Sequence, residues 1–318
     1  MTSIADGSRT SGRAETMGVW FVVKKTLRKP QFWFGFTMIV PLLIWYWIFS
    51  FWPIIQAFRM STVAYKLLDP GNSPFVGLGN FIKISQHPLF WVSVKNTILW
   101  AVYSFIFNLP LAMLIAVFLS KVKRGRNVYQ ALIFVPVVVS LVAVSLLFKM
   151  VMDPEVGQLN KLLSTIGLPE LQWLSSSSSA LPTAVVIATW KGLGFFVVIL
   201  TAGMLNIPSE LYDAALVDGT NPWQQFWRIT MPLMSHTILL VTVLLAIGSL
   251  QEFTLPTVLF GSEGGPGNST FLYNLLVYQE AFLDIRFGTA TAASLFQFAF
   301  ILTISILQIK LIRPSWTY

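Results

Sequence analysis

Residues 96–120 read NTILWAVYSFIFNLPLAMLIAVFLS, a run without Asp, Glu, Lys or Arg. An α-helix rises about 1.5 Å per residue, so this run is long enough to cross the hydrocarbon core of a bilayer, which is about 30 Å thick. Lipid offers no hydrogen-bond partners, and a helix satisfies its own backbone. The run therefore predicts a transmembrane helix.

Similar charge-free runs recur on both sides of this one. They lie at 31–58, 127–148, 229–251 and 287–309, and a further run at 174–209 is broken only by Lys191. A membrane β-barrel would instead show short segments of alternating hydrophobicity. We expect an all-α polytopic membrane protein with six transmembrane helices, at about 31–58, 96–120, 127–150, 181–207, 234–258 and 287–311.

The composition excludes an ordinary soluble domain. The chain has 318 residues, of which 55% are hydrophobic and 11% charged, and its mean hydropathy is +0.70. Soluble domains carry roughly a quarter charged residues. The net charge of +8 fits the basic loops that membrane proteins keep in the cytoplasm, so we expect no nucleic-acid partner. With no cysteine in the chain, disulfides, thiolate metal sites and cysteine nucleophiles are excluded.

Basic residues predict the orientation. Lys and Arg gather in the N-terminal tail, 1–30, and in the link at 121–126. Both segments should be cytoplasmic. Part of the tail, 17–29, mixes aromatic and basic residues and is a candidate interfacial helix. Six crossings place both termini, including residues 314–318, in the cytoplasm.

A polar segment lies between the fourth and fifth predicted spans. Residues 210–232 read ELYDAALVDGTNPWQQFWRITMP. Proline cannot continue a helical hydrogen-bond ladder, so Pro208 should end the preceding span, and Ser209 is a residue type that caps a new helix. Asp218 followed by Gly219 favours a left-handed C-cap at the end of this first short helix.

A second short helix should follow directly. Asn221 is a good N-cap residue, and Pro222 suits the first helical position, where its missing N–H is not needed. We expect Pro232 to end this helix. The count of spans places both helices on the cytoplasmic face.

This polar segment resembles a known motif. The pattern Asp213-Ala-Ala-x-x-Asp218-Gly219, followed by Phe226-x-x-Ile229-x-x-Pro232, is similar to the EAA loop of permease subunits of binding-protein-dependent ABC importers. That motif usually begins with Glu, whereas this chain has the shorter Asp. The residues that match the motif are Asp213, Ala214, Ala215, Asp218, Gly219, Phe226, Ile229 and Pro232.

Other segments extend the resemblance to the carbohydrate-uptake, maltose-type branch of these permeases. They lie at 75–81, 190–195, 202–208 and 264–270. The resemblance implies a type I ABC importer permease fold over residues 31–313, in which 208–232 forms a loop of coupling helices. It also implies a bacterial or archaeal inner membrane.

The resemblance further implies a set of partners. The loop would dock on a cytoplasmic ABC ATPase dimer, and a second permease subunit would complete the pathway, with family habit favouring a heterodimer. An external binding protein would deliver a sugar or related polar solute. The sequence holds no GxxxxGK[ST] motif, so we expect a non-catalytic chain without cofactor, with ATP and Mg on the ATPase subunit.

Ionisable residues inside spans are the first candidates for a solute site, because they are rare there and more often functional. Lys191 and Glu252 are such residues; alternatively they pair with each other or reach toward the membrane surface. The resemblance places solute contacts in the same two spans. The candidate pathway residues are Trp190, Lys191, Gly192, Phe195, Ser249, Gln251 and Glu252.

Two other functions stay open at this point. An ion-gradient-driven secondary transporter could use Lys191 and Glu252 as its coupling charges. An intramembrane enzyme is less supported, because we find no catalytic residues and no metal site: the two histidines, His87 and His236, lie far apart in the sequence. A gradient-driven carrier needs no cytoplasmic docking loop, so the 208–232 loop favours the importer.

Overall fold

The computed structural model describes residues 29–312, and within this range the regular secondary structure is helical, apart from one isolated bridge between Val63 and Phe75. The predicted all-α class is confirmed. The basic tail up to residue 28, with most of the candidate interfacial helix, and the C-terminal residues 314–318 lie outside the described residues.

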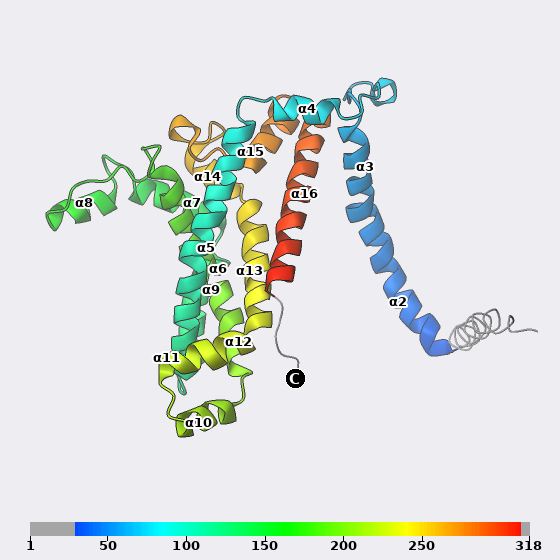
Figure 1. Cartoon of the computed structure of the whole chain (residues 1–318). Coiled ribbons are helices and arrows are strands. Elements are labelled where there is room, and N and C mark those ends of the chain that lie inside the picture. The colour runs from blue at the N-terminus through cyan, green and yellow to red at the C-terminus, as the bar shows by residue number, and fades with distance from the viewer. Residues whose placement is uncertain (1–28, 313–318) are drawn as a thin grey trace, which may run out of the picture. The chain divides into compact units, whose positions relative to one another are not determined.

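The chain divides into two units, Met1–Arg59 and Met60–Tyr318. The first unit contains α2 (Pro30–Tyr46), a π-helical turn η1 (Trp47–Phe51) and most of α3 (Trp52–Ser61). These elements continue one another as a single long helix (Figure 1). Together they are apolar and long enough to cross a membrane. Aromatic side chains follow one another along it, including the close pair Trp45 and Phe49.

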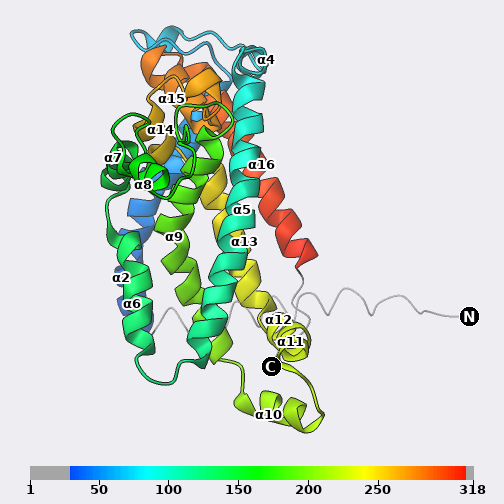
Figure 2. The same cartoon turned by 90° about the vertical axis from the view of Figure 1, so that its left-hand side faces the viewer.

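The second unit is built around three helices that run side by side (Figures 1 and 2). They are α5 (Phe90–Lys121), α9 (Ala180–Leu205) and α13 (Ser235–Leu250). A short α14 (Thr254–Phe260) continues α13 after a break, and α16 (Phe287–Leu311) packs against α13. Each of these long helices, with α14 counted as part of α13, could cross a membrane by length and composition.

The sequence interpretation expected one helix at 127–150, but the structure has two. α6 (Arg126–Val138) and α7 (Leu141–Val151) meet at an angle of 87°. Pro136 weakens the end of α6, and Val139 is extended, so the helical ladder stops there. The described part of the chain thus has five helices suited to span a membrane, or six if this bent pair is one span.

Glycines let the helices of the second unit approach closely. A Cβ atom at Gly194 of α9 would lie 2.4 Å from the carbonyl oxygen of Ile133 in α6. At Gly203, farther along α9, it would lie 2.6 Å from the hydroxyl of Thr237 in α13. Small residues at such contacts allow backbones to pack tightly within a membrane. α9 is therefore held between α6 and α13.

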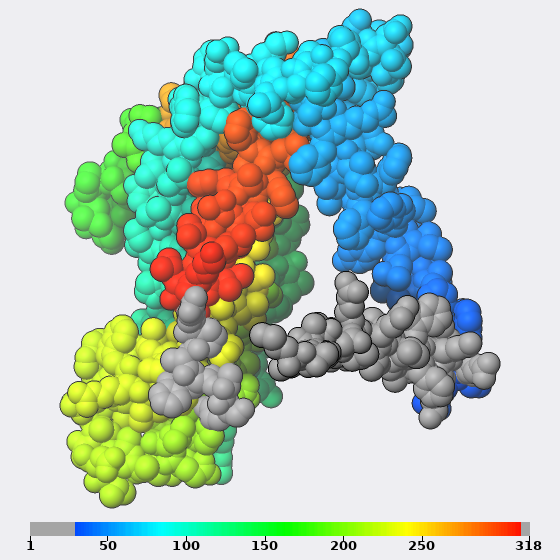
Figure 3. Space-filling model, turned by 45° about the vertical axis from the view of Figure 1, so that its right-hand side comes forward, coloured from blue at the N-terminus to red at the C-terminus, as the bar shows by residue number. Residues whose placement is uncertain are grey.

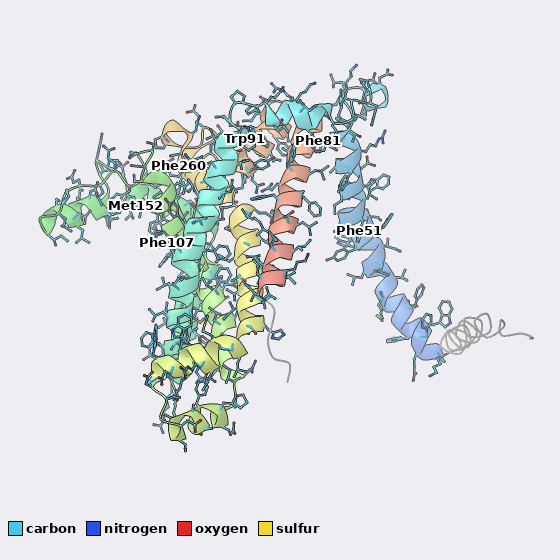
Figure 4. All side chains as sticks on the ribbon, viewed as in Figure 1. Phe51, Phe81, Trp91, Phe107, Met152 and Phe260 are labelled. Atoms are coloured by element: carbon cyan, nitrogen blue, oxygen red, sulfur yellow. The ribbon has the colours of Figure 1, made fainter. Side chains whose placement is uncertain are left out.

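The hydrophobic core of this unit includes the two broken spans. Trp100 of α5 is fully buried in a cluster with residues of α7, α9 and α14. Met152, directly after α7, belongs to this cluster, and Phe260 of α14 packs against it (Figure 4). The second helices of the two broken spans, α7 and α14, are thus packed on each other and on α5.

Short elements gather at the two ends of the second unit (Figures 1 and 2). The α4 end carries α4 (Gly79–Ser85), α15 (Tyr273–Tyr278) and the π-turn η5 (Gln279–Leu283). Two 3-10 turns, Pro70–Asn72 and Pro266–Asn268, and α8 (Gln158–Thr165) lie in the remaining loops. The opposite end, called the loop end below, carries α10 (Ser209–Val217), α11 (Pro222–Gln225), the π-turn η3 (Phe226–Thr230) and α12 (Met231–Leu233).

Candidate functional site

The 208–232 loop forms a distinct lobe at the loop end (Figure 3). Its first helix, α10, begins differently from the sequence prediction. Pro208 is the N-cap residue, Ser209 is already the first helical residue, and no side chain caps the helix. The prediction of Ser209 as the cap was therefore wrong. Glu210 lies in the first turn of α10, where the positive end of the helix dipole stabilises its negative charge.

The end of α10 confirms the predicted left-handed turn. Gly219 has a φ of +76°, and its own N–H donates to the carbonyl of Leu216. The N–H and hydroxyl of Thr220 both donate to the carbonyl of Ala215, at 3.0 and 2.6 Å. This pattern is a Schellman motif, which satisfies the last carbonyl groups of a helix and favours glycine at the left-handed position.

The second helix of the loop begins as predicted but ends later. Asn221 and Gln224 form a reciprocal capping box over Pro222. The expectation that Pro232 ends the helix was wrong, because the chain stays helical through η3 and α12 to Leu233. A proline removes one N–H and crowds the preceding turn, and the wider π-turn accommodates both effects.

The motif residues differ in exposure. Asp213 and Ala214 are exposed to solvent, whereas Ala215 is only 7% exposed. Asp218 and Gly219 are exposed, and no atom lies within 4 Å of a Cβ built on Gly219. The partly buried members are Phe226, Ile229 and Pro232.

The exposed side of α10 is not wholly polar. Leu216 and Val217 are 60% and 89% exposed at its C-terminal end, next to the exposed carboxylate of Asp213 one turn earlier. An apolar pair beside a carboxylate, carried on a lobe, is a surface suited to a protein partner.

Lys191 lies within α9 and Glu252 lies between α13 and α14, and each contacts a helix end at a break in a span. The Lys191 ammonium donates to the carbonyl oxygen of Val137, 3.0 Å away at the last turn of α6. The Glu252 carboxylate accepts the N–H groups of Phe253 and Leu255, at 3.1 and 3.2 Å, at the start of α14. A cation at a helix C-terminus and an anion at an N-terminus are both favoured by the helix dipole.

The alternative of a direct pair between these charges is not what the structure shows. Within residues 29–312, the ion pairs shorter than 4 Å do not include Lys191 with Glu252. Each charge instead has backbone partners of its own. Both residues therefore act as helix caps at the two breaks.

Among the described residues, no side-chain hydrogen bond or ring contact joins the other pathway candidates to one another. Trp190 and Phe195 are exposed on α9, and Trp190 meets Phe148 of α7 edge to face at 5.4 Å. Ser249 is buried, and its hydroxyl donates to Ala246 within α13. Of the remaining candidates, Gln251 is exposed and Gly192 is partly buried with open space beside its Cα.

Comparison with known proteins places this chain in a family. The family model described as "Binding-protein-dependent transport system inner membrane component" matches residues 108–317, which includes the whole 208–232 loop. The chain belongs to this family. It is therefore a multi-pass component of an inner membrane and a permease subunit of a binding-protein-dependent importer.

Individual members of this family are similar over most of their length. The trehalose/maltose transport system permease protein MalF of Thermococcus litoralis is 30% identical over 279 residues, covering 88% of this chain and 93% of the relative. The multiple sugar-binding transport system permease protein MsmF of Streptococcus mutans is also 30% identical, covering 91% and 97%. A solved bacterial ABC transporter involved in the import of alginate superposes with a TM-score of 0.79 at 26% identity, covering 94% and 99%.

Sequence reasoning missed a buried charge cluster at the α4 end of this permease. Glu280 is only 2% exposed and accepts hydrogen bonds from Thr289 and, at 3.4 Å, from Arg286. The imidazole of His87 lies 3.8 Å from the same carboxylate. Arg286 comes six residues after Glu280, and the π-turn and the sharp turn at Ile285 between them left no helical spacing to detect.

A neighbouring tyrosine was missed for the same reason. Burial raises the pKa of Tyr273 above its usual range, so its hydroxyl stays protonated and donates to the carbonyl of Ala293, 3.1 Å away. This bond ties α15 to α16. Like the Glu280 cluster, it depends on contacts between segments distant along the chain.

Proposed function

We propose that this permease subunit forms half of the translocation pathway of an ATP-driven importer for a sugar or related polar solute. The observation that carries the proposal is the exposed surface of α10, where Asp213, Leu216 and Val217 project from a rigidly capped lobe. In this account α10 is the coupling helix, and it docks on a cytoplasmic ABC ATPase dimer. The loop end and both termini then face the cytoplasm.

Sugar as the solute is supported by the names of the relatives. MalF and MsmF are described as permeases of trehalose/maltose and multiple-sugar systems, and the solved alginate transporter imports a polysaccharide. A related structure of that transporter contains a pentasaccharide-bound periplasmic protein. We propose that an extracytoplasmic binding protein likewise delivers solute to the α4 end of this permease.

The remaining partners follow from the same account. A second permease subunit, different from this chain, would complete the pathway in the lipid bilayer. ATP and Mg would bind the ATPase subunits, and this chain would hold no cofactor. The gradient-driven alternative is weakened, because Lys191 and Glu252 are engaged as helix caps.

The docking of α10 can be tested by co-purification with the cognate ATPase subunit. Val217→Glu places a charge in the centre of the proposed contact, and desolvating it should weaken association by about tenfold or more. Lys161→Glu is the control, since it changes an exposed charge on α8, outside the loop. Unchanged association of Val217→Glu, or equal loss in both variants, would reject the docking surface.

A further inference from the structure

Tyr212 connects α10 to the rest of the loop end. Its hydroxyl lies 2.9 Å from the hydroxyl of Thr230, which is 7% exposed in the π-turn η3. Its ring packs against a buried cluster that includes Met204, Ile207 and Met234. Among the described residues, no other hydrogen bond runs from an α10 side chain to another element. Tyr212 is thus the side chain that anchors the exposed helix.

The surroundings of this bond are not densely packed. A cavity of about 690 Å³ lies between the loop and the ends of α5 and α9. Both Tyr212 and Thr230 line it, so their hydrogen bond joins the α10 part of the lining to the η3 part. Its other polar lining residues include Ser120, Lys121, Asn206 and Gln225. Empty space cannot transmit force between elements. Any displacement of α10 must therefore reach the neighbouring helices through the contacts around the cavity.

Thr230 leads directly into α13. Its carbonyl accepts the N–H of Met234 at 3.0 Å, and the Met234 carbonyl accepts the N–H of Ile238 in α13 at 2.8 Å. The Thr230 hydroxyl can also donate to the Gln225 carbonyl at 3.5 Å while it accepts from Tyr212. Side-chain and backbone bonds thus form a continuous path from α10 through η3 to a spanning helix.

We propose that the Tyr212–Thr230 hydrogen bond is the strut through which displacement of α10 moves α13, so that it sets how much solute is transported per ATP. The inference rests on the proposed docking of α10 and assigns positioning roles to two residues outside the exposed docking surface. Without the hydroxyl pair, α10 stays connected through its flanking turns, which can flex. ATP hydrolysis would then continue, while α13 would follow the displacement of α10 less closely.

The strut can be tested in the complete complex, reconstituted in proteoliposomes with its ATPase, second permease and binding protein. Tyr212→Phe and Thr230→Val each remove one hydroxyl and keep the bulk of the side chain. We expect each to lower the ratio of solute taken up to ATP hydrolysed by about threefold to tenfold, the range for one hydrogen bond. The double variant should be no worse than either single one, because both remove the same bond.

Two controls make the outcome specific. Tyr129→Phe removes a hydroxyl from an exposed tyrosine of α6 and should leave the ratio unchanged. Thr230→Ser keeps the hydroxyl and should restore the ratio. ATPase co-purification should remain within about twofold of the wild type in all variants, since none of them alters the exposed docking surface.

Several results would overturn the strut. One is a wild-type ratio of solute to ATP in both Tyr212→Phe and Thr230→Val, and another is additive losses in the double variant. A third is loss of assembly in both single variants, which would assign the pair to folding. If the wild-type chain itself binds no ATPase or transports without ATP, the proposed function fails, and this is seen before any variant is compared.

Discussion

Lys191 shows that a charge inside a spanning helix can have a structural role. Its ammonium donates to the Val137 carbonyl, a group left free where α6 ends. From the sequence alone it was a solute candidate, because nothing in the run 174–209 reveals that another helix ends beside it. The charge was predictable, whereas its partner, 54 residues away, was not.

Removing this cap should destabilise the permease. We expect Lys191→Met to lower the free energy of unfolding by about 1–3 kcal/mol, because a partly buried carbonyl loses its charged donor. Lys191→Arg should retain most of the stability. Thermal unfolding in detergent can measure the difference against Lys149→Met, an exposed lysine of α7. Equal losses in Lys191→Met and Lys149→Met would contradict the capping role.

Gly219 allows a prediction based on backbone conformation alone. Its φ of +76° is costly for residues with a Cβ, yet the space around it is open. Gly219→Ala should therefore cost about 1–2 kcal/mol in the left-handed turn, and weaken ATPase binding by up to about tenfold. Gly219→Asn should bind better than Gly219→Ala, since asparagine tolerates this conformation.

Gly248→Ala is the control for this experiment, because it also meets open space but lies within α13. Binding can be measured by titrating the ATPase subunit onto the permease in nanodiscs. If alanine at 219 binds as well as glycine, the turn does not need its left-handed conformation for docking.

At the scale of elements, the contact between α6 and α9 can be tested with a matched pair of glycines. Gly194→Ala would force its methyl group against the Ile133 carbonyl, so we expect a loss of about 1–3 kcal/mol. Gly192→Ala meets no atom within 4 Å and should be neutral or slightly stabilising. Thermal unfolding of the two variants separates packing from helix propensity. Equal stability of both variants would refute the close approach of α6 and α9.

The turn after α7 should depend on pH. The backbone N–H groups of Val156 and Glu155 lower the pKa of Asp153 by bonding its carboxylate, each at 3.0 Å. A lowered folded-state pKa means that this stabilisation is present above the unfolded value of about 3.9 and is lost as the pH falls through the folded value. Protection of the two amides from hydrogen exchange, relative to their intrinsic exchange rates, should therefore fall below about pH 4.

Asp153→Asn is the matching variant, because the amide can accept the same bonds without titrating. Its exchange rates, corrected for intrinsic chemistry, should change less between pH 5 and pH 3 than those of the wild type. An identical pH response in both proteins would show that another group controls the turn.

The helices illustrate what could and could not be predicted at this scale. The predicted spans 96–120, 181–207 and 287–311 largely coincide with α5, α9 and α16, because the absence of charge along a run is a local property. The charge-free run at 127–148 did not reveal the break between α6 and α7, because the chain is apolar on both sides of it. The break follows Pro136, which weakens the end of α6.

For the whole molecule, too, features set by local sequence were predictable and features set by contacts between distant segments were not. The 208–232 loop was recognisable because its caps, Gly219, Asn221 and Pro222, act locally. Its internal anchor, Tyr212 with Thr230, was missed because the two residues are 18 positions apart and the sequence spacing does not show that the chain between them folds back. The solute pathway was the least predictable part, since its candidates were drawn from two helices whose facing sides depend on packing.

The central claim is that this permease moves a sugar or related solute only when an ATPase acts on α10. The most direct measurement is uptake of a panel of labelled sugars into proteoliposomes that contain the assembled complex, with ATP enclosed and the binding protein outside. The account predicts uptake that requires both ATP and the binding protein and falls in Val217→Glu. Uptake driven by an ion gradient without ATP, or unaffected by Val217→Glu, would contradict it.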